Sequence, residues 1–211
     1  MISFSGIDCS GKSTQIDLLC KRLKKQEKKY QVIWSRGGYT PGMEAVKKLL
    51  RGRTSPASNE EKISYSEQVN SNSKKRKLLF VASLMDLWFY YSVALRVKEW
   101  FGTVVICDRY IWDTYIDFKI KYPEYDFEHG FWWRLTLKTM LKPQASFCLF
   151  IPAEESMRRS RLKEEPFPES VEARRERIDW YIRELDNNRW QYRIDATKSI
   201  DEVHAAIVER L

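Results

Sequence analysis

The chain has 211 residues, of which 43% are hydrophobic and 31% are charged, and its formal net charge is +8. This length and composition favour one soluble domain, or one domain with a lid, around a sizeable core. The positive charge favours an anionic partner: nucleic acid, an acidic membrane surface or a phosphorylated small molecule. The two histidines lie far apart and the four cysteines form no C-x-x-C pair, which argues against a zinc site and indicates free thiols in a reducing compartment.

The first third of the sequence predicts two strands and the helices that follow them. Residues 2–5 form an apolar run typical of a short strand, and residues 12–28 have the pattern of a helix with one apolar and one lysine-rich face. A second strand is predicted at 31–35, followed by a glycine-containing loop and a helix at 43–52. Residues 52–77 are rich in Ser, Asn and Lys, which indicates a loop or a frayed helix.

A long apolar segment, "LLFVASLMDLWFYYSVAL" at residues 78–95, has about the minimum length of a membrane-spanning helix. Asp86 lies in its middle, where a carboxylate in lipid would cost about 2.5–3.5 kcal/mol. We therefore expect a buried helix of a soluble protein and no membrane partner. The apolar strand starts directly after Met1, without the charged leader of a signal peptide, so a cytoplasmic location is expected.

The remaining sequence continues the alternation of strands and helices. Strands are predicted at residues 103–108, 145–151 and 190–195, and helical segments at 110–141, from 153, at 170–188 and at 199–211. Such an alternation predicts a parallel sheet of about five strands with helices on both faces. Ligands of these sheets bind beyond the carboxyl ends of the strands, so the loops there are the candidate sites.

Residues 6–13, "GIDCSGKS", match the phosphate-loop pattern G-x-x-x-x-G-K-[ST] between a predicted strand and a predicted helix. The glycines allow close approach of the backbone to a polyphosphate, and successive N–H groups face its oxygens. The lysine reaches the β- and γ-phosphates, and the serine hydroxyl suits Mg²⁺. The predicted fold class is therefore α/β, the three-layer sandwich of the P-loop NTPases with a short lid. The predicted ATP-binding residues of the loop are Gly6, Asp8, Cys9, Ser10, Gly11, Lys12, Ser13 and Thr14.

A second acidic strand end, "VVICDRY", contributes Asp108 and Arg109. A carboxylate in this place can hold Mg²⁺ directly or through water, so Ser13 and Asp108 are the predicted metal ligands. ATPases often carry a second carboxylate next door to activate water. Arginine cannot act as that base, but its planar fork suits a phosphate. The pair favours transfer to a phosphorylated acceptor over hydrolysis, and a structural ion pair is the alternative.

At this point the sequence resembles the thymidylate kinase family. Four segments occur in the family's order, "GIDCSGKSTQ", "SRGGYTPG", "LLFVAS" and "DRY", and "RIDAT" around Ala196 is similar to the family's adenine-side loop. The resemblance covers nearly the whole chain. It implies one P-loop kinase domain over 1–211 with a lid at about 153–172, ATP and Mg²⁺ as cofactors, and a nucleoside monophosphate, most directly thymidylate, as the acceptor.

The resemblance also implies roles for residues outside the phosphate loop. Arg36 and Arg109 would hold the acceptor's phosphate, and Phe80 would stack on its base. Asp8 would approach the acceptor's sugar or organise the phosphate site. Asp108 would assist the metal, and the donor's phosphates would lie on the loop, with Lys12 catalytic.

Some members of the family carry a catalytic arginine within the phosphate loop, where this chain has Cys9. Phosphoryl transfer still benefits from a cation on the moving group. Arg158, Arg159 and Arg161 in "RRSRLK" are therefore predicted to supply it from the lid. A solvated basic helix face is the alternative for each of them taken singly.

Three positions depart from the family's acceptor site. The family's base-reading arginine corresponds to Leu84, and a leucine cannot hydrogen-bond a base. Asp113 and Asp117 stand where a serine and an aromatic residue commonly line the sugar and base, so they are predicted to line the acceptor. Three acceptors stay open: thymidylate bound differently, another nucleoside monophosphate, or a different phosphorylated metabolite. A P-loop ATPase with a macromolecular partner is a less favoured rival.

The basic run "SKKRK" at 73–77 is compatible with nucleic-acid binding, but a solvated helix start is the preferred interpretation. No nucleic-acid partner is therefore expected. A homodimer is expected only from the resemblance.

Overall fold

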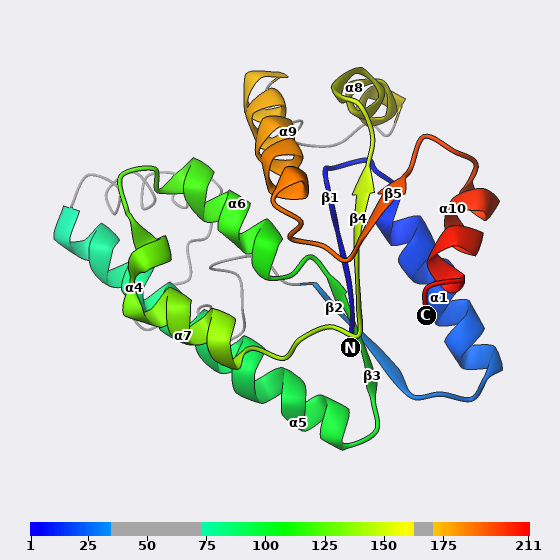
Figure 1. The fold of residues 1–211 in the computed structure, drawn as a ribbon, viewed down its shortest axis with the longest axis horizontal. Coiled ribbons are helices and arrows are strands. Elements are labelled where there is room, and N and C mark those ends of the chain that lie inside the picture. Colours follow the sequence, from blue (N-terminus) through cyan, green and yellow to red (C-terminus); the bar gives the residue numbers. More distant parts are fainter. Residues whose placement is uncertain (35–72, 163–170) are drawn as a thin grey trace, which may run out of the picture. The chain divides into compact units, whose positions relative to one another are not determined.

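The computed structural model describes residues 1–34, 73–162 and 171–211 (Figure 1). Arg36 and the helix predicted at 43–52 lie outside these residues. The chain divides into two compact units, which are described separately. The first contains residues 1–36, 97–125 and 142–211, and the second contains residues 37–96 and 126–141.

The first unit is built on a five-stranded sheet with the order β2-β3-β1-β4-β5, in which all neighbouring strands pair in parallel. The strands are β1 (Ile2–Gly6), β2 (Tyr30–Trp34), β3 (Val104–Asp108), β4 (Ala145–Phe150) and β5 (Tyr192–Asp195). Each one falls on a run that the sequence predicted as a strand, so the prediction of a five-stranded parallel sheet is confirmed. The ends of β1 and β3 are the places where a ligand of such a sheet is expected.

Helices cover both faces of this sheet, which confirms the three-layer α/β fold. They are α1 (Lys12–Lys25), α6 (Ile111–Lys121), α8 (Ala153–Leu162), α9 (Val171–Asp186) and α10 (Ile200–Val208). Figure 1 shows α1 and α10 on one side of the strands and α6 and α9 on the other. A further helix, α5 (Leu95–Trp100), leads into β3.

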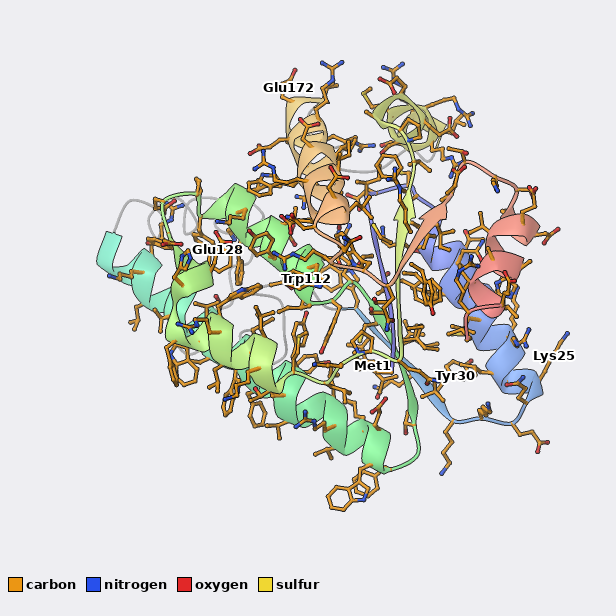
Figure 2. The ribbon with its side chains drawn as sticks, in the orientation of Figure 1. Met1, Lys25, Tyr30, Trp112, Glu128 and Glu172 are labelled. Carbon is orange, nitrogen blue, oxygen red and sulfur yellow. The ribbon has the colours of Figure 1, made fainter. Side chains whose placement is uncertain are left out.

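The amphipathic pattern of α1 explains how it covers the sheet. Ile16, Leu19 and Leu23 recur at helical spacing and are buried, whereas the basic residues of its last turn are exposed. Figure 2 shows Lys25 extending away from the ribbon at the end of this helix. Beneath it, every residue of β1 is buried, and Phe4 stacks on Phe147 of β4 with ring centroids 5.4 Å apart. Apolar burial of this kind provides most of the driving force that fixes the sheet.

The second unit contains α4 (Ser73–Phe89), the π-helical turn η1 (Tyr90–Ala94), the 3₁₀ turn η2 (Phe127–His129) and α7 (Phe131–Thr139). The helix begins at Ser73, so the basic run forms its start, as the sequence favoured. The π turn was not predicted. Trp88 and Ser92 reach the hydroxyl of Thr139 in α7, at 3.1 and 2.9 Å.

The helix Arg76–Trp100 is long and apolar enough to cross a membrane by length and composition, and 39% of its most apolar window is buried inside the structure. A core helix of a soluble protein meets the same criterion. All four cysteines are free thiols, and burial raises the pKa of Cys107 to about 12.

Candidate active site

The phosphate loop is held open by backbone conformations that side chains rarely adopt. Gly6, Cys9 and Gly11 have φ values of +139°, +63° and +88°. Left-handed residues alternating with right-handed ones turn successive N–H groups toward one point, which forms an anion-binding concavity. Gly11 is the N-cap of α1 and, being glycine, makes no side-chain capping hydrogen bond. The first N–H groups of α1 are therefore available to an anion beyond the helix N-terminus.

Lys12 lies under this loop and is almost fully buried. Its Nζ donates to the backbone carbonyls of Gly6 and Ile7, both at 2.8 Å. Burial and, to a smaller extent, the neighbouring Arg109 lower the pKa of Lys12 to about 8, against the opposing effect of Asp8 and Asp108. A triphosphate on the loop would offer Lys12 oxygens with more negative charge than these carbonyls.

Two buried oxygens beside the loop have no hydrogen-bond partner among the residues that the structure describes: Ser10 Oγ and Asp108 Oδ1. Burial raises the pKa of Asp108, and Lys12 and Arg109 counteract this effect. A buried polar atom without a partner is costly and calls for a ligand or a water. The described residues contain no group of three or more His, Cys, Asp or Glu that is arranged to hold a metal. A Mg²⁺ ion here would therefore take most of its ligands from phosphates and water, as is common for this ion.

A cleft of about 720 Å³ opens over the phosphate loop within the first unit. Eight consecutive loop and helix residues line it, from Asp8 to Gln15. Asp108 and Arg109 come from the end of β3, and Ala196 follows β5. The predicted ATP-binding residues after Gly6 thus line one continuous space, together with Trp34 and Lys198, which sequence reasoning missed. An aromatic residue at the end of β2 could have been identified from its place at a strand's carboxyl end.

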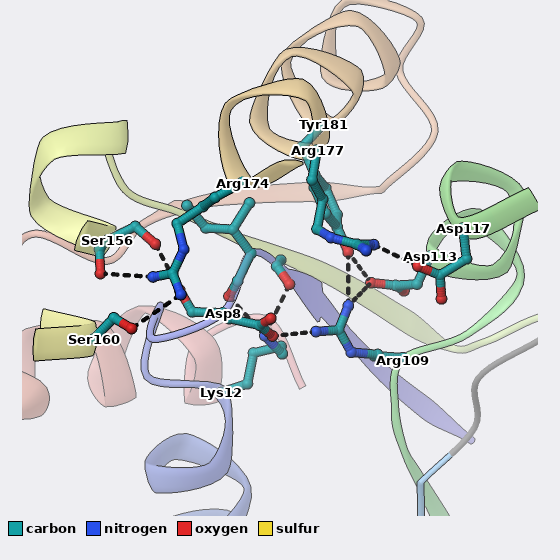
Figure 3. Close-up of polar contacts among 12 residues, drawn as sticks. Asp8, Lys12, Arg109, Asp113, Asp117, Ser156, Ser160, Arg174, Arg177 and Tyr181 are labelled. Carbon is teal, nitrogen blue, oxygen red and sulfur yellow. Dashed lines mark hydrogen bonds and ion pairs between the residues drawn. The ribbon is translucent and has the colours of Figure 1, made fainter. Parts of the chain in front are cut away.

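Arg109 lies at the centre of a buried polar network (Figure 3). Its side chain forms an ion pair with Asp8 of the phosphate loop through Nη2. Its Nη1 donates to the hydroxyl of Tyr181 at 3.2 Å and lies 3.8 Å from Asp113. The structure thus brings together two of the predicted acceptor residues, Asp8 and Arg109, at the edge of the cleft.

The other two aspartates predicted to line the acceptor have protein partners in the structure. Asp113 accepts hydrogen bonds from the hydroxyls of Ser5 and Tyr181 and from the backbone N–H of Tyr110. Asp117 forms a buried ion pair with Arg177 of α9. Their assignment to the acceptor stays a prediction, but neither carboxylate lines the cleft over the loop.

Helix α9 carries polar residues that sequence reasoning did not select. Arg174, Arg177 and Tyr181 occur at helical spacing on the face of α9 that is buried. Arg174 donates to the backbone carbonyl of Ser156 at 3.2 Å and to Ser160 Oγ at 2.9 Å, both in α8. The i, i+3, i+7 spacing was visible in the sequence, but an arginine-rich face is normally read as a solvated one.

Helix α8 lies within the predicted lid segment and carries the three arginines. Arg159 lines the cleft and donates to the carbonyl of Ala196 at 3.0 Å. Glu155 accepts from both Arg158 and Arg159, and these hydrogen bonds lower its pKa to about 2. Arg158 and Arg161 line a separate hollow. In addition, Ser156 Oγ of α8 donates to the backbone carbonyl of Asp8 at 3.0 Å.

Phe80 and Leu84 belong to the second unit and are buried there. Phe80 packs edge-on against Phe127, with ring centroids 5.8 Å apart, and Phe127 packs against Trp133. Both assignments to the acceptor stay predictions, and Arg36 lies outside the described residues.

Several known proteins have sequences similar to this chain. The thymidylate kinase family profile matches residues 4–207. A thymidylate kinase of Sulfurihydrogenibium sp. is 28% identical over 216 residues, covering 100% of this chain and 95% of the relative. A thymidylate kinase of Plasmodium falciparum is 25% identical over 213 residues, covering 100% of this chain and 88% of the relative. A probable thymidylate kinase of Methanocaldococcus jannaschii is 27% identical over 208 residues, covering 98% of this chain and 93% of the relative. The chain belongs to the thymidylate kinase family.

Proposed function

We propose that this protein is a nucleoside monophosphate kinase that transfers the γ-phosphoryl group of ATP to thymidylate, giving thymidine diphosphate and ADP. The observation that carries the proposal is the direct contact between the phosphate loop and the second anion-binding group. Asp8 of the loop pairs with Arg109 at the edge of the cleft, so a phosphate on the loop and a phosphate on Arg109 would be neighbours. The family's members named as thymidylate kinases support thymidylate as the acceptor.

Different residues of the cleft bind the two anionic substrates. The N–H groups of the loop and Lys12 hold the donor's phosphates, and Arg109 holds the acceptor's phosphate in line with them. Catalysis then consists of positioning and charge neutralisation, without a covalent intermediate. Arg109 cannot lose its proton at any working pH, so it keeps its charge through the reaction.

Mg²⁺ fits the residues next to the loop. Ser13 and Asp108 both line the cleft, and Asp108 Oδ1 lacks a partner among the described residues. Ser13 and Asp108 would hold the ion, which would supply positive charge to neutralise the charge that develops on the phosphates. Burial raises the pKa of Asp108, while the nearby Lys12 and Arg109 favour its carboxylate form.

The lid remains part of the proposal, at about 153–172. Of its three arginines, we favour Arg159 for contact with the nucleotide because it lines the cleft beside Ala196. Arg158 and Arg161 do not line this cleft, so their contact with the transferring phosphoryl group would need a rotation of the helix or of their side chains. We also propose that the protein is cytoplasmic and that it forms a homodimer. Light scattering on the purified protein tests the dimer.

The proposal is tested by steady-state kinetics with ATP, Mg²⁺ and each common nucleoside monophosphate in turn. We expect thymidylate to give the highest kcat/KM. Lys12→Ala should abolish transfer to every acceptor, whereas Arg109→Ala should raise the KM of the acceptor and leave ATP binding intact. Turnover with a different phosphorylated metabolite alone would contradict the nucleotide assignment, and acceptor-independent ATP hydrolysis would favour the ATPase alternative.

A further inference from the structure

Arg109 is held in a backbone conformation that needs support from its surroundings. Its φ is +76°, in the left-handed region that non-glycine residues rarely occupy. Such a conformation costs about 1–3 kcal/mol and persists only where neighbouring contacts fix it. One such contact is the hydrogen bond from the N–H of Arg109 to the carbonyl of Phe4, at 2.8 Å. The guanidinium group makes further contacts. Arg109 as a whole residue is 5% exposed.

The two ends of this guanidinium have different surroundings (Figure 3). Nη1 faces the interior, where it meets the Tyr181 hydroxyl at 3.2 Å and Asp113 at 3.8 Å. Nη2 pairs with Asp8. The side chain of Asp8 is 40% exposed, whereas that of Asp113 is fully buried. The interior partners are buried, and Asp8 is the partner that a ligand in the cleft can replace.

The two interior partners of Arg109, Tyr181 and Asp113, are hydrogen-bonded to each other. Asp113 accepts from Ser5, from the N–H of Tyr110 and from Tyr181, so both of its oxygens accept hydrogen bonds. Burial and the nearby Asp113 raise the pKa of Tyr181 well above its ordinary value, so its hydroxyl stays protonated. The single proton of that hydroxyl is donated to Asp113, which leaves the oxygen free to accept from Arg109.

We propose that Tyr181 is a positioning residue for the acceptor's phosphate: it fixes Nη1 of Arg109 toward α9, so that Nη2 faces the cleft and exchanges Asp8 for the phosphate. This inference rests on the proposed function. It also assigns Asp113 to the support of Arg109 and Tyr181 rather than to the acceptor. A phosphate monoester carries more charge than the carboxylate of Asp8 and offers more acceptor oxygens, so it competes effectively for Nη2.

Tyr181→Phe isolates the hydroxyl from the packing of the ring. Tyr181 is 1% exposed and its ring stacks on Trp190 at 5.8 Å, a contact that phenylalanine keeps. Without the hydroxyl, the nearest acceptor for Nη1 is Asp113, and the guanidinium is expected to turn toward it and away from the cleft. Loss of one charge-assisted hydrogen bond predicts a KM of the acceptor that is raised about tenfold, with a lower kcat. The KM of ATP should stay within about twofold, because the loop is unchanged.

The experiment compares the wild-type protein, Tyr181→Phe and Tyr192→Phe with thymidylate and ATP as the varied substrates. Tyr192 lies at the start of β5, and its ring stacks on that of Phe147 with centroids 5.3 Å apart. Tyr192→Phe is the control because it also removes a tyrosine hydroxyl, but one that is not bonded to Arg109. Asp113→Asn is a second variant, for which the same selective rise in the acceptor's KM is expected. Binding of ATP, followed by thermal shift, reports that each variant is folded.

The outcomes separate the inference from the proposed function. A rise in the acceptor's KM in Tyr181→Phe but not in Tyr192→Phe supports the positioning role. Unchanged kinetics in Tyr181→Phe and Asp113→Asn, beside an active wild type, would overturn it. Equal loss of affinity for ATP and acceptor would also overturn it, because that pattern indicates a general structural effect. An inactive wild-type protein would instead contradict the proposed function.

Discussion

Gly6 and Gly11 allow a matched test of how the phosphate loop is built. A Cβ on Gly6 would lie 2.3 Å from the backbone carbonyl oxygen of Leu149, which is paired with Gly6 across β1 and β4. A Cβ on Gly11 would meet nothing within 4 Å. Both residues have positive φ, so alanine is strained at both positions, but only at Gly6 must two strands also separate.

The two variants should therefore differ clearly in stability. Gly11→Ala should lower the free energy of unfolding by about 1 kcal/mol, the cost of a left-handed conformation. Gly6→Ala should lower it by about 3 kcal/mol, from about 1–3 kcal/mol of backbone strain and about 1 kcal/mol for a weakened ladder hydrogen bond. Urea unfolding followed by tryptophan fluorescence measures both losses, provided that the free energy of unfolding depends on urea concentration with the same slope in the variants and the wild type. A loss in Gly6→Ala no larger than that in Gly11→Ala would refute this reasoning about the β1–β4 contact.

Three other results are expected. Burial lowers the pKa of Lys12 to about 8, so this lysine loses its charge above that pH in the free protein. The affinity for ATP, measured by calorimetry, should therefore fall about tenfold between pH 7 and 9. An affinity that does not change with pH would contradict this role of Lys12. Arg177→Met removes the buried ion pair with Asp117, which should lower the free energy of unfolding in urea by about 3–5 kcal/mol. The double variant Arg177→Met/Asp117→Leu should recover most of this loss, and a double variant no more stable than the single one would show that the pair is not coupled. Arg159→Ala should weaken ATP binding more than Arg161→Ala, since Arg159 alone of the two lines the cleft; equal effects would argue against the arrangement of α8.

The strands and the phosphate loop could be predicted because local sequence determines them strongly. The run ending in Asp108 is β-branched and buried, and the loop pattern lies between a strand and a helix, where its glycines have a steric function. Both features depend on residues that are neighbours in the chain. They carried over to the structure with boundaries shifted by only a few residues.

The network around Arg109 could not be predicted in the same way, because it joins residues from distant parts of the chain. Ser5, Asp113 and Tyr181 meet only once β1, α6 and α9 are packed together. On α9, the buried face contains Arg174 and Arg177 where apolar residues are the usual expectation. Charged residues are rarely buried unless they are paired, and the pairing partners of these arginines come from other helices.

The central claim is that the phosphate loop and Arg109 present two phosphates to each other in one cleft. The most direct measurement uses ATP labelled with ³²P in its γ-phosphate, with the purified protein, Mg²⁺ and thymidylate. The account predicts that the label appears in thymidine diphosphate, and that Lys12→Ala and Arg109→Ala prevent this at low acceptor concentration. Label released as inorganic phosphate, at a rate independent of any nucleoside monophosphate, would contradict it.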